Sequence, residues 1–325
     1  MLSRTADHLY WMARYTERAE NIARMLDVNY QMSLLPQGGN VIEQSWIATL
    51  SISDLMAAYQ KKHDSVTPAK ALAFMAFDRD NPSSIYNCLW SARENARAVR
   101  GTLTSEMWET LNSTWIEMRR AVTRYSLGAE IADFFEWVKY RSHLTRGVTQ
   151  GTMLRDEAFH FTWLGTYLER ADNTARILDV KYHLLLPRGE GAGGSVDYYQ
   201  WSALLRSVSA FAIYRKVYRD LITPRRVAEL LILTDEMPRS MHRCMSQVYT
   251  HLKAIANAQS AETERRAGEM HASLLFGRID AILEMGLHEY LEEFLVRIAD
   301  LGERISLDFL VPSLNKQGQS SRSGA

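Results

Sequence analysis

The stretch YTERAENIARMLDVNY, residues 15–30, returns with small changes 152 residues later as YLERADNTARILDVKY, residues 167–182. Over residues 1–30 and 153–182 the two copies are identical at 16 of 30 positions. Outside this stretch, both cysteines and six of the seven prolines fall at matched places. A repeat of this length indicates that the chain consists of two divergent copies of one structural unit.

The apolar residues of the repeated stretch follow a helical period. His8, Trp11, Tyr15, Ile22 and Leu26 share one face when about 100° is counted per residue. Glycine and proline breaks divide the first copy into six expected helices, 3–34, 43–62, 68–79, 82–101, 105–127 and 130–149, and we expect six counterparts in the second. The sequence therefore predicts an all-α, multi-helix bundle of about twelve helices, built from two divergent repeats related by a pseudo-two-fold axis.

The repeats also predict the domain organisation. We expect the first repeat to span residues 1–152 and the second to span residues 153–312. Almost no linker separates them, which favours one fused body over two separate bundles. Residues 313–325 are rich in serine, glycine and glutamine, and we expect a disordered tail there.

Three helix starts can be predicted from capping residues. Thr67 and Thr223 are each followed by proline, which is typical of an N-cap followed by proline in the first helical position. Asn81, also followed by proline, predicts a similar start for the helix expected at 82–101.

The composition excludes several classes of protein. Lys+Arg and Asp+Glu both total 38 in the 325 residues, so a general nucleic-acid binder or a polybasic membrane protein is not expected. No run approaches the roughly 20 apolar residues that span a bilayer. Only two cysteines are present, which favours a reducing cytoplasm as the location.

A polar stripe recurs on the repeated helix. Glu17, Asn21 and Arg24 lie within about 60° of one another, with Asp27 beside them and Arg18 displaced toward one side. The second copy keeps the same residue types at these positions: Glu169, Asn173, Arg176, Asp179 and Arg170. Two explanations remain open. The stripe is either an ion-pair and amide network that joins the repeated helices, or a polar cavity that binds an anionic or amide ligand.

Two further polar clusters are not duplicated. Arg93, Arg97 and Arg100 lie on one side of a helix, and the matched positions in the second copy are Tyr249, Lys253 and Ala256. Arg155, Asp156 and Glu157 open the second repeated helix, where carboxylates also complement the helix dipole. Divergence of a solvated face is the alternative for the arginines. The candidate ligand-binding residues are Arg18, Asn21, Arg24, Arg93, Asn95, Arg97, Arg155, Asp156, Arg170, Asn173 and Arg176.

Other chemistry is weakly indicated. Glu157 and His160 form one Glu-x-x-His motif, whereas di-iron bundles need two such motifs and two more glutamates, so no metal site is predicted. The sequence contains no Walker loop, and no nucleotide or other cofactor is predicted. If the chain is an enzyme, Glu17 and Glu169 are the candidates for acid–base catalysis.

These segments together resemble the alpha-E family, a bacterial all-helical family named for its Glu-Arg motif. The segments that carry the resemblance are Glu17-Arg18-Ala19, Glu169-Arg170-Ala171, Met1-Leu2-Ser3-Arg4-Thr5-Ala6, Ala92-Arg93-Glu94-Asn95-Ala96-Arg97 and Thr152-Met153-Leu154-Arg155-Asp156-Glu157. The resemblance covers residues 1–312. One departure is Thr166, because an arginine is expected before Tyr167, as Arg14 precedes Tyr15 in the first copy.

The resemblance implies a setting for the protein. Members of the family are commonly encoded beside, or fused to, a circularly permuted ATP-grasp protein, often with a transglutaminase-like protein. ATP-grasp enzymes join a carboxylate to an amine. We therefore expect an accessory, non-catalytic helical subunit that binds such a ligase or its anionic or peptide ligand in peptide synthesis or modification. An enzyme that completes the amide chemistry with the Glu/Arg cluster and an oligomeric scaffold are the alternatives.

Overall fold

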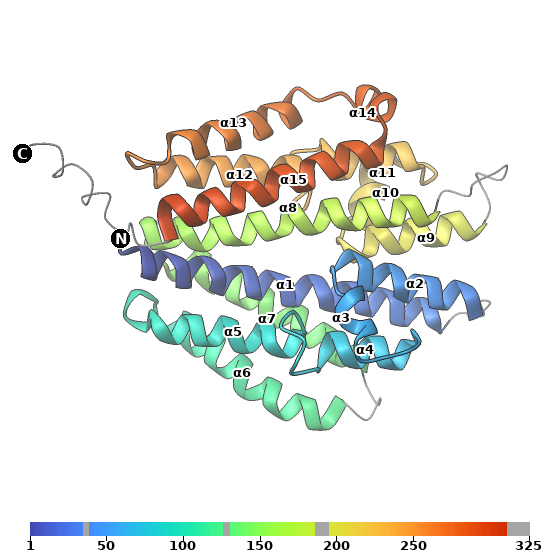
Figure 1. Cartoon of the computed structure of the whole chain (residues 1–325), viewed down its shortest axis with the longest axis horizontal. Helices are drawn as coiled ribbons and strands as arrows, with labels where there is room; N and C mark the ends of the chain where they lie inside the picture. Colours follow the sequence, from blue (N-terminus) through green and yellow to red (C-terminus); the bar gives the residue numbers. More distant parts are fainter. Residues whose placement is uncertain (35–38, 126–130, 186–194, 311–325) are drawn as a thin grey trace, which may run out of the picture.

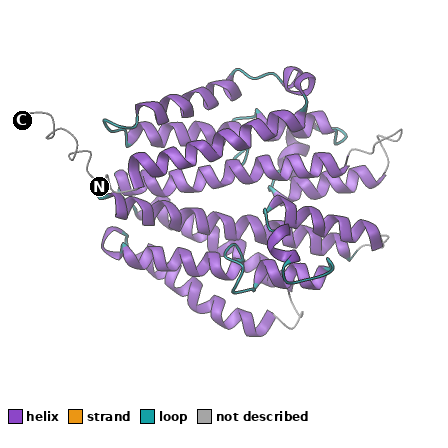
Figure 2. Ribbon diagram, in the orientation of Figure 1, coloured by secondary structure: helices purple, strands orange, loops and turns teal. Residues whose placement is uncertain are grey.

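The computed structural model describes residues 1–34, 39–125, 131–185 and 195–310. These residues form fifteen α-helices and no strand (Figure 2). The all-α prediction is therefore confirmed, although the helices outnumber the twelve that the sequence indicated. The tail expected at 313–325 lies outside the described residues.

The fifteen α-helices of the described residues divide into seven in the first half of the chain and eight in the second. The first half holds α1 (Ser3–Ser33), α2 (Gly39–Ile52), α3 (Met56–Gln60), α4 (Pro68–Ala76), α5 (Ile85–Ala98), α6 (Ser105–Tyr125) and α7 (Ile131–Thr152), with a 3₁₀ turn at Arg100–Thr102. The second half holds α8 (Glu157–Leu185), α9 (Ser195–Ser207), α10 (Phe211–Tyr218), α11 (Pro224–Ile232), α12 (Met241–Ala254), α13 (Ala261–Leu275), α14 (Ile279–Met285) and α15 (Leu287–Ile305), with a final π turn at Ser306–Leu310.

The two long helices α1 and α8 lie side by side through the middle of the molecule (Figure 1). Helices α5 and α7 pack against α1, and α12 and α15 pack against α8. Helices α6 and α13 lie outside these layers, at opposite edges of the view. Because neighbours surround α1 and α8, both helices bury more than one face. Of their polar stripes, Glu17, Asn21, Glu169 and Arg170 are buried.

The packing between α1 and α8 is closest near Gly165. A Cβ atom at this position would lie 2.3 Å from the backbone oxygen of Tyr10 and 3.3 Å from the Cβ of Ala13. Leu9 and Leu164, which neighbour this crossing in sequence, are fully buried. Glycine therefore allows the two helix backbones to approach at the point where the halves meet.

The prediction of one continuous helix at 43–62 was wrong, because the helix is interrupted between α2 and α3. Asp54 adopts a left-handed conformation with φ of 55°, and the amide of Leu55 donates to the carbonyl of Leu50 at 2.8 Å. This geometry ends a helix and satisfies its last carbonyl groups. Aspartate tolerates the left-handed region better than most residues, and Ser209 adopts the same conformation after α9, with φ of 57°.

The capping predictions have two outcomes. Thr67 and Thr223 cap α4 and α11 as predicted, with each hydroxyl accepting from the amide three residues on. The helix predicted at 82–101 instead begins at Ile85, because Ser84 is its N-cap and Asn81 forms a turn with Ser83. Within the described part of the chain, no helix combines the length and the apolar character needed to cross a membrane.

Candidate functional site

The Glu-Arg pairs of the two long helices hold each other across the α1–α8 interface. Glu17 on α1 accepts hydrogen bonds from Arg170 on α8, from Nε at 2.9 Å and from Nη2 at 2.8 Å. Glu169 on α8 accepts in the same way from Arg18 on α1, from Nε at 2.5 Å and from Nη2 at 3.0 Å. The arginine of each motif thus binds the carboxylate of the other in the bidentate geometry that guanidinium groups favour.

Each carboxylate has a different set of additional partners. Glu169 also accepts from Arg14 Nε at 2.8 Å, whereas the position of the second helix that corresponds to Arg14 is Thr166. Glu17 lacks that neighbour and is held by Arg146 of α7 and by Arg239, which precedes α12. Thr166 therefore leaves Glu17 without an equivalent of Arg14, and Arg146 and Arg239 provide positive charge beside Glu17 instead.

Glu20 extends the network around Glu17. Its side chain is fully buried, and its carboxylate accepts from Arg239 Nη2 at 2.5 Å and from Arg24 Nε at 2.8 Å. It also accepts from Arg146 and from Ser142, at 2.7 Å from the latter. Two buried carboxylates are thus surrounded by four arginines, which fits the principle that buried charges must be paired.

The electrostatics of the network favour permanent ionisation of both motif carboxylates. Burial raises the pKa of Glu17, but the surrounding guanidinium groups, that of Arg170 foremost, outweigh it and lower the pKa to about 2. Burial is likewise outweighed at Glu169, where Arg18 and then Arg14 lower the pKa to about 2. A carboxylate with so low a pKa is a weak base at neutral pH, which does not favour acid–base catalysis by these glutamates.

The other stripe residues have separate environments. Asn21 accepts from Arg239 at 2.9 Å, and its buried Nδ2 has no hydrogen-bond partner within the described part of the chain. Arg176 pairs with Asp172 on the same helix at 2.9 Å. Asn173 is half-buried on α8. Of the stripe residues in the second copy, Arg170 is therefore the one that joins the network around Glu17.

The unduplicated candidates lie away from this network. Arg93 and Arg97 bind Glu94 on α5, and Asn95 lies 2.8 Å from His8 Nδ1. Asp156 caps α8 by accepting from the amides of the second and third residues after it, as a carboxylate at a helix start is expected to do. Arg155 lies over the ring of Phe159, with 6.0 Å from its Cζ to the ring centroid. The structure therefore does not bring these residues together with the Glu-Arg pairs.

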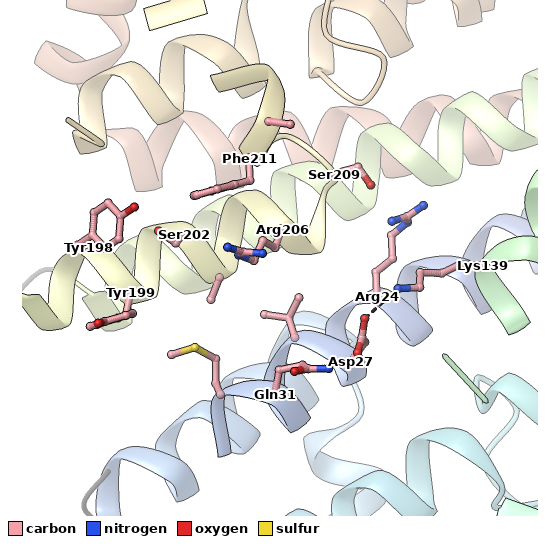
Figure 3. A pocket seen from close by; sticks show the side chains of 14 residues that line it. Arg24, Asp27, Gln31, Lys139, Tyr198, Tyr199, Ser202, Arg206, Ser209 and Phe211 are labelled. Carbon is pink, nitrogen blue, oxygen red and sulfur yellow. Dashed lines mark hydrogen bonds and ion pairs between the residues drawn. The ribbon is translucent and has the colours of Figure 1, made fainter. Parts of the chain in front are cut away.

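A cavity of about 760 Å³ lies between α1, α7, α9 and the start of α10. Figure 3 shows Arg24 and Asp27 of α1 facing Arg206 of α9 across this cavity. Lys139 of α7 also lines it and donates to Asp27 at 2.8 Å. Among the candidates predicted from the sequence, Arg24 is the one that lines this cavity, and it connects the cavity to the buried network through Glu20.

The cavity combines positive charge with aromatic surface. Arg206 lies over Phe211 at 4.3 Å from Cζ to the ring centroid, and Tyr198 and Tyr199 on α9 are about half exposed beside them. Three cationic side chains and one carboxylate leave an excess of positive charge in the lining. Such a site can hold an anionic group and also bury an apolar or peptide portion of a ligand.

Comparison with known proteins assigns the family. Residues 1–310 match the Alpha-E family, described as a predicted alpha-helical domain with a conserved ER motif. The chain belongs to this family. The resemblance inferred from the motifs is thus confirmed, and in this Alpha-E chain the Glu-Arg motif occurs twice and pairs with itself across α1 and α8.

The Alpha-E chain is similar to longer mycobacterial proteins. An uncharacterized protein of Mycobacterium bovis and two of Mycobacterium tuberculosis are each 24% identical to it over 319 residues. The alignments cover 91% of this chain but 35% of each relative, so the chain spans about a third of the length of these proteins. No solved structure matches the chain.

Several residues of the Alpha-E network could not be found by matching the repeats. Glu20 corresponds to Asp172, so a carboxylate is present in both copies but residue identity is not. Arg239 corresponds to Ser83, and Arg146 lies where the similarity between the copies has faded. A search for charge type instead of identity would have found Glu20.

A histidine pair, with His251 buried and His160 half-buried, gives this Alpha-E chain a predictable pH dependence. His160 on α8 and His251 on α12 meet with their Nδ1 atoms 2.9 Å apart. Burial lowers the pKa of both imidazoles, and the pKa of His251, which also faces His160, falls to about 4. As the pH falls from the unfolded value of 6.5 toward 4, the unfolded chain therefore binds protons that the folded chain does not.

We expect His251 alone to lower the free energy of unfolding by about 2 kcal/mol between pH 7 and pH 5. Urea unfolding of the wild type and of His251→Phe at both pH values measures this term. Phenylalanine keeps an aromatic ring beside Phe159 and Tyr167, and the variant is expected to lose most of the difference. An equal fall in the variant would show that other groups cause it.

Proposed function

We propose that this Alpha-E protein is a helical accessory subunit that works with an ATP-grasp ligase in peptide synthesis or modification. In this proposal the cavity between α1 and α9 binds an anionic peptide ligand of the ligase. A transglutaminase-like protein is a further partner in the same system. The setting is the cytoplasm, where the ligase obtains its ATP.

The cavity is the observation that carries this proposal. Arg24, Lys139 and Arg206 offer donors for carboxylates, while Tyr198 and Tyr199 offer surface for a peptide backbone or an apolar side chain. The length of the mycobacterial relatives is a second support, because the matched region is about a third of each of those chains. A module that lies within a longer polypeptide fits a role beside another catalytic part.

The buried glutamates support binding in preference to catalysis. Glu17 and Glu169 are 1% and 5% exposed, and each is held by the guanidinium group of the opposite helix. Neither residue lines the cavity between α1 and α9. In the proposed function these glutamates hold the two halves together, and the cavity is the site of recognition.

We further propose that the two halves are divergent repeats related by a pseudo-two-fold axis and fused into one body, with their boundary at residues 152 and 153. Three matched features support this architecture. The helices α1 and α8 each pack against the helix that follows the third proline of their half, α5 and α12. The left-handed residues Asp54 and Ser209 end matched helices. The Glu-Arg pairs exchange partners across the interface.

A titration of the cavity tests the ligand class. We expect the peptide Ala-Glu-Glu-Ala to bind at least tenfold more tightly than Ala-Gln-Gln-Ala in isothermal titration calorimetry, both with amidated C-termini, because only the first then supplies carboxylates. Arg206→Gln is expected to weaken the binding about tenfold, a loss of about 1.4 kcal/mol. Arg215→Gln on α10 is the matched control, since Arg215 is exposed and does not line the cavity.

The outcomes separate the ligand from the partner. Equal binding of both peptides, or no effect of Arg206→Gln, would overturn the assignment of the cavity. Co-elution with an ATP-grasp protein from the same organism tests the partner in a separate size-exclusion experiment. No complex at micromolar concentrations, with and without ATP, would overturn the partnership and leave the cavity assignment standing.

A further inference from the structure

The face formed by α5 and α6 carries a ladder of arginine and aromatic side chains. Arg93 and Arg100 both lie over Trp108, with 5.4 Å and 5.2 Å from each Cζ to the ring centroid. Tyr86, near the start of α5, contacts Trp115 of α6 at 5.0 Å between ring centroids, and Arg79, which precedes α5, lies over Tyr86 at 5.1 Å. These residues, together with Trp90, Arg97 and Asn112, are called the α5–α6 face below.

The members of the α5–α6 face lie along one side of each helix. Tyr86, Trp90, Arg93 and Arg97 are separated by four, three and four residues on α5 and its end. Trp108, Asn112 and Trp115 show the same spacing on α6. Residues at these separations share a helix side, and Arg93 Nε donates across to Asn112 at 3.2 Å.

This face is accessible and positively charged. Trp90 is 46% exposed and the Arg97 side chain 63% exposed, and Arg100 is exposed as well. Within the face, Glu94 is the carboxylate that pairs with Arg93 and Arg97. Four guanidinium groups and Glu94 give these residues a net charge of +3, while Asp78 and Asp80, which flank Arg79, pair with Lys62.

The acidic residues of α6 do not share the side that Trp108 occupies. Glu106 lies about 160° from Trp108 around the helix, and Glu109 lies about 100° from it. Glu106 therefore points away from the line of Trp108, Asn112 and Trp115, whereas Glu109 lies at its side, about 60° from Asn112. Glu94 neutralises part of the positive charge of the face, and the remaining net charge is positive.

The second half of the chain does not repeat this face. The positions that match Arg93, Arg97 and Arg100 are Tyr249, Lys253 and Ala256 on and after α12. There Lys253 lies over Tyr249, which stacks on His271 of α13. The guanidinium groups are thus present once in each chain.

We propose that the α5–α6 face is a docking surface for an acidic polypeptide segment of a partner protein. Carboxylates of the segment pair with Arg97, Arg100 and Arg79, and its apolar side chains cover Trp90. Tryptophan, tyrosine and arginine are the residues that contribute most at protein interfaces, where they combine apolar area with directed hydrogen bonds. Charge complementarity selects an acidic occupant, and the face is distinct from the cavity because none of its residues lines it.

Fluorescence anisotropy with a labelled 16-residue peptide of four Glu-Glu-Ala-Leu repeats tests this inference. In an Arg206→Gln background, which weakens the cavity, we expect one peptide per chain, binding at least tenfold more tightly than the peptide with glutamine in place of glutamate. The affinity should fall as salt is added, because the pairs are partly exposed. The variant Arg97→Glu/Arg100→Glu is expected to lose at least tenfold in affinity, and Trp90→Ala to lose severalfold.

The matched control is Lys253→Glu, which reverses an exposed charge at the position equivalent to Arg97. It is expected to leave the affinity within twofold of the wild type. Circular dichroism and urea midpoints equal to the wild type show that the exposed variants fold. Wild-type affinity in Arg97→Glu/Arg100→Glu, or an equal loss in Lys253→Glu, would overturn the proposal.

Two further measurements separate this face from other sites and other ligands. The binding lost in Arg97→Glu/Arg100→Glu should persist in Arg206→Gln, so failure at the cavity and failure at this face are distinguishable. A 16-nucleotide single-stranded DNA and vesicles containing 30% phosphatidylserine are expected not to displace the peptide. Displacement by either one, lost in Arg97→Glu/Arg100→Glu, would show that the face recognises phosphate and not an acidic polypeptide.

Discussion

Replacing Glu17 by glutamine is expected to lower the free energy of unfolding by about 4 kcal/mol. The substitution keeps the size of the side chain but removes the charge that pairs with Arg170, Arg239 and Arg146. Removing one partner of a buried ion pair leaves the other charge without compensation, which typically costs 3–5 kcal/mol. Urea unfolding at pH 7, followed by tryptophan fluorescence, measures the loss.

The matched control for this variant is Glu262→Gln on α13. Glu262 also binds two arginines, Arg265 and Arg266, and these hydrogen bonds also lower its pKa to about 2. Its side chain is 42% exposed, however, so water solvates the arginines when the carboxylate is removed. We expect little change in the control. A loss in Glu17→Gln no larger than in the control would show that the buried network does not stabilise the fold.

The same variant has a defined pH dependence. The pKa of Glu17 is lowered to about 2 in the folded chain from the ordinary value of 4.5. The stabilisation is therefore fully present above pH 4.5 and is lost as the pH falls toward 2. The difference between the wild type and Glu17→Gln should disappear over the same interval. Equal stability of the wild type and the variant near pH 2 would show that the difference at pH 7 is ionic, because a change in packing would persist at low pH.

The sequence predicted the network in outline but could not separate it from a ligand site. The recurrence of Glu17 and Glu169 with their arginines indicated that both copies use these residues, and it left two explanations open. Periodicity places a side chain on a face of its own helix, and only the packing of α1 on α8 decides what covers that face. The structure places α7 and α8 there, which makes the ion pairs internal.

The cavity could not be predicted for a different reason. Its lining comes from α1, α7, α9 and α10, and Lys139 and Arg206 carry no motif and do not recur at matched positions of the other copy. Such a site is created by tertiary packing, so its members share no spacing along the chain. Arg24 was found because it belongs to the repeated stripe. The helices, in contrast, follow from local signals such as Thr67 and Thr223, whose caps depend on neighbouring residues alone.

Gly165→Ala is the second substitution with a large expected effect, a loss of about 2 kcal/mol or more in the free energy of unfolding. The new Cβ would lie 2.3 Å from the backbone oxygen of Tyr10, which belongs to α1 and cannot move without moving that helix. Overpacking of this kind costs about 1–3 kcal/mol and exceeds the gain of up to about 1 kcal/mol from replacing glycine in a helix. Urea unfolding at pH 7 measures the difference.

Gly147→Ala on α7 is the control that measures the effect of helix propensity alone. A Cβ at Gly147 meets nothing within 4 Å, so this variant is expected to be more stable than the wild type by up to about 1 kcal/mol. Opposite signs for the same substitution would show that contact between α1 and α8, and not helix propensity, sets the requirement for glycine at 165. A stabilised Gly165→Ala would mean that the long helices can separate without loss, and that the Glu-Arg pairs do not depend on their close approach.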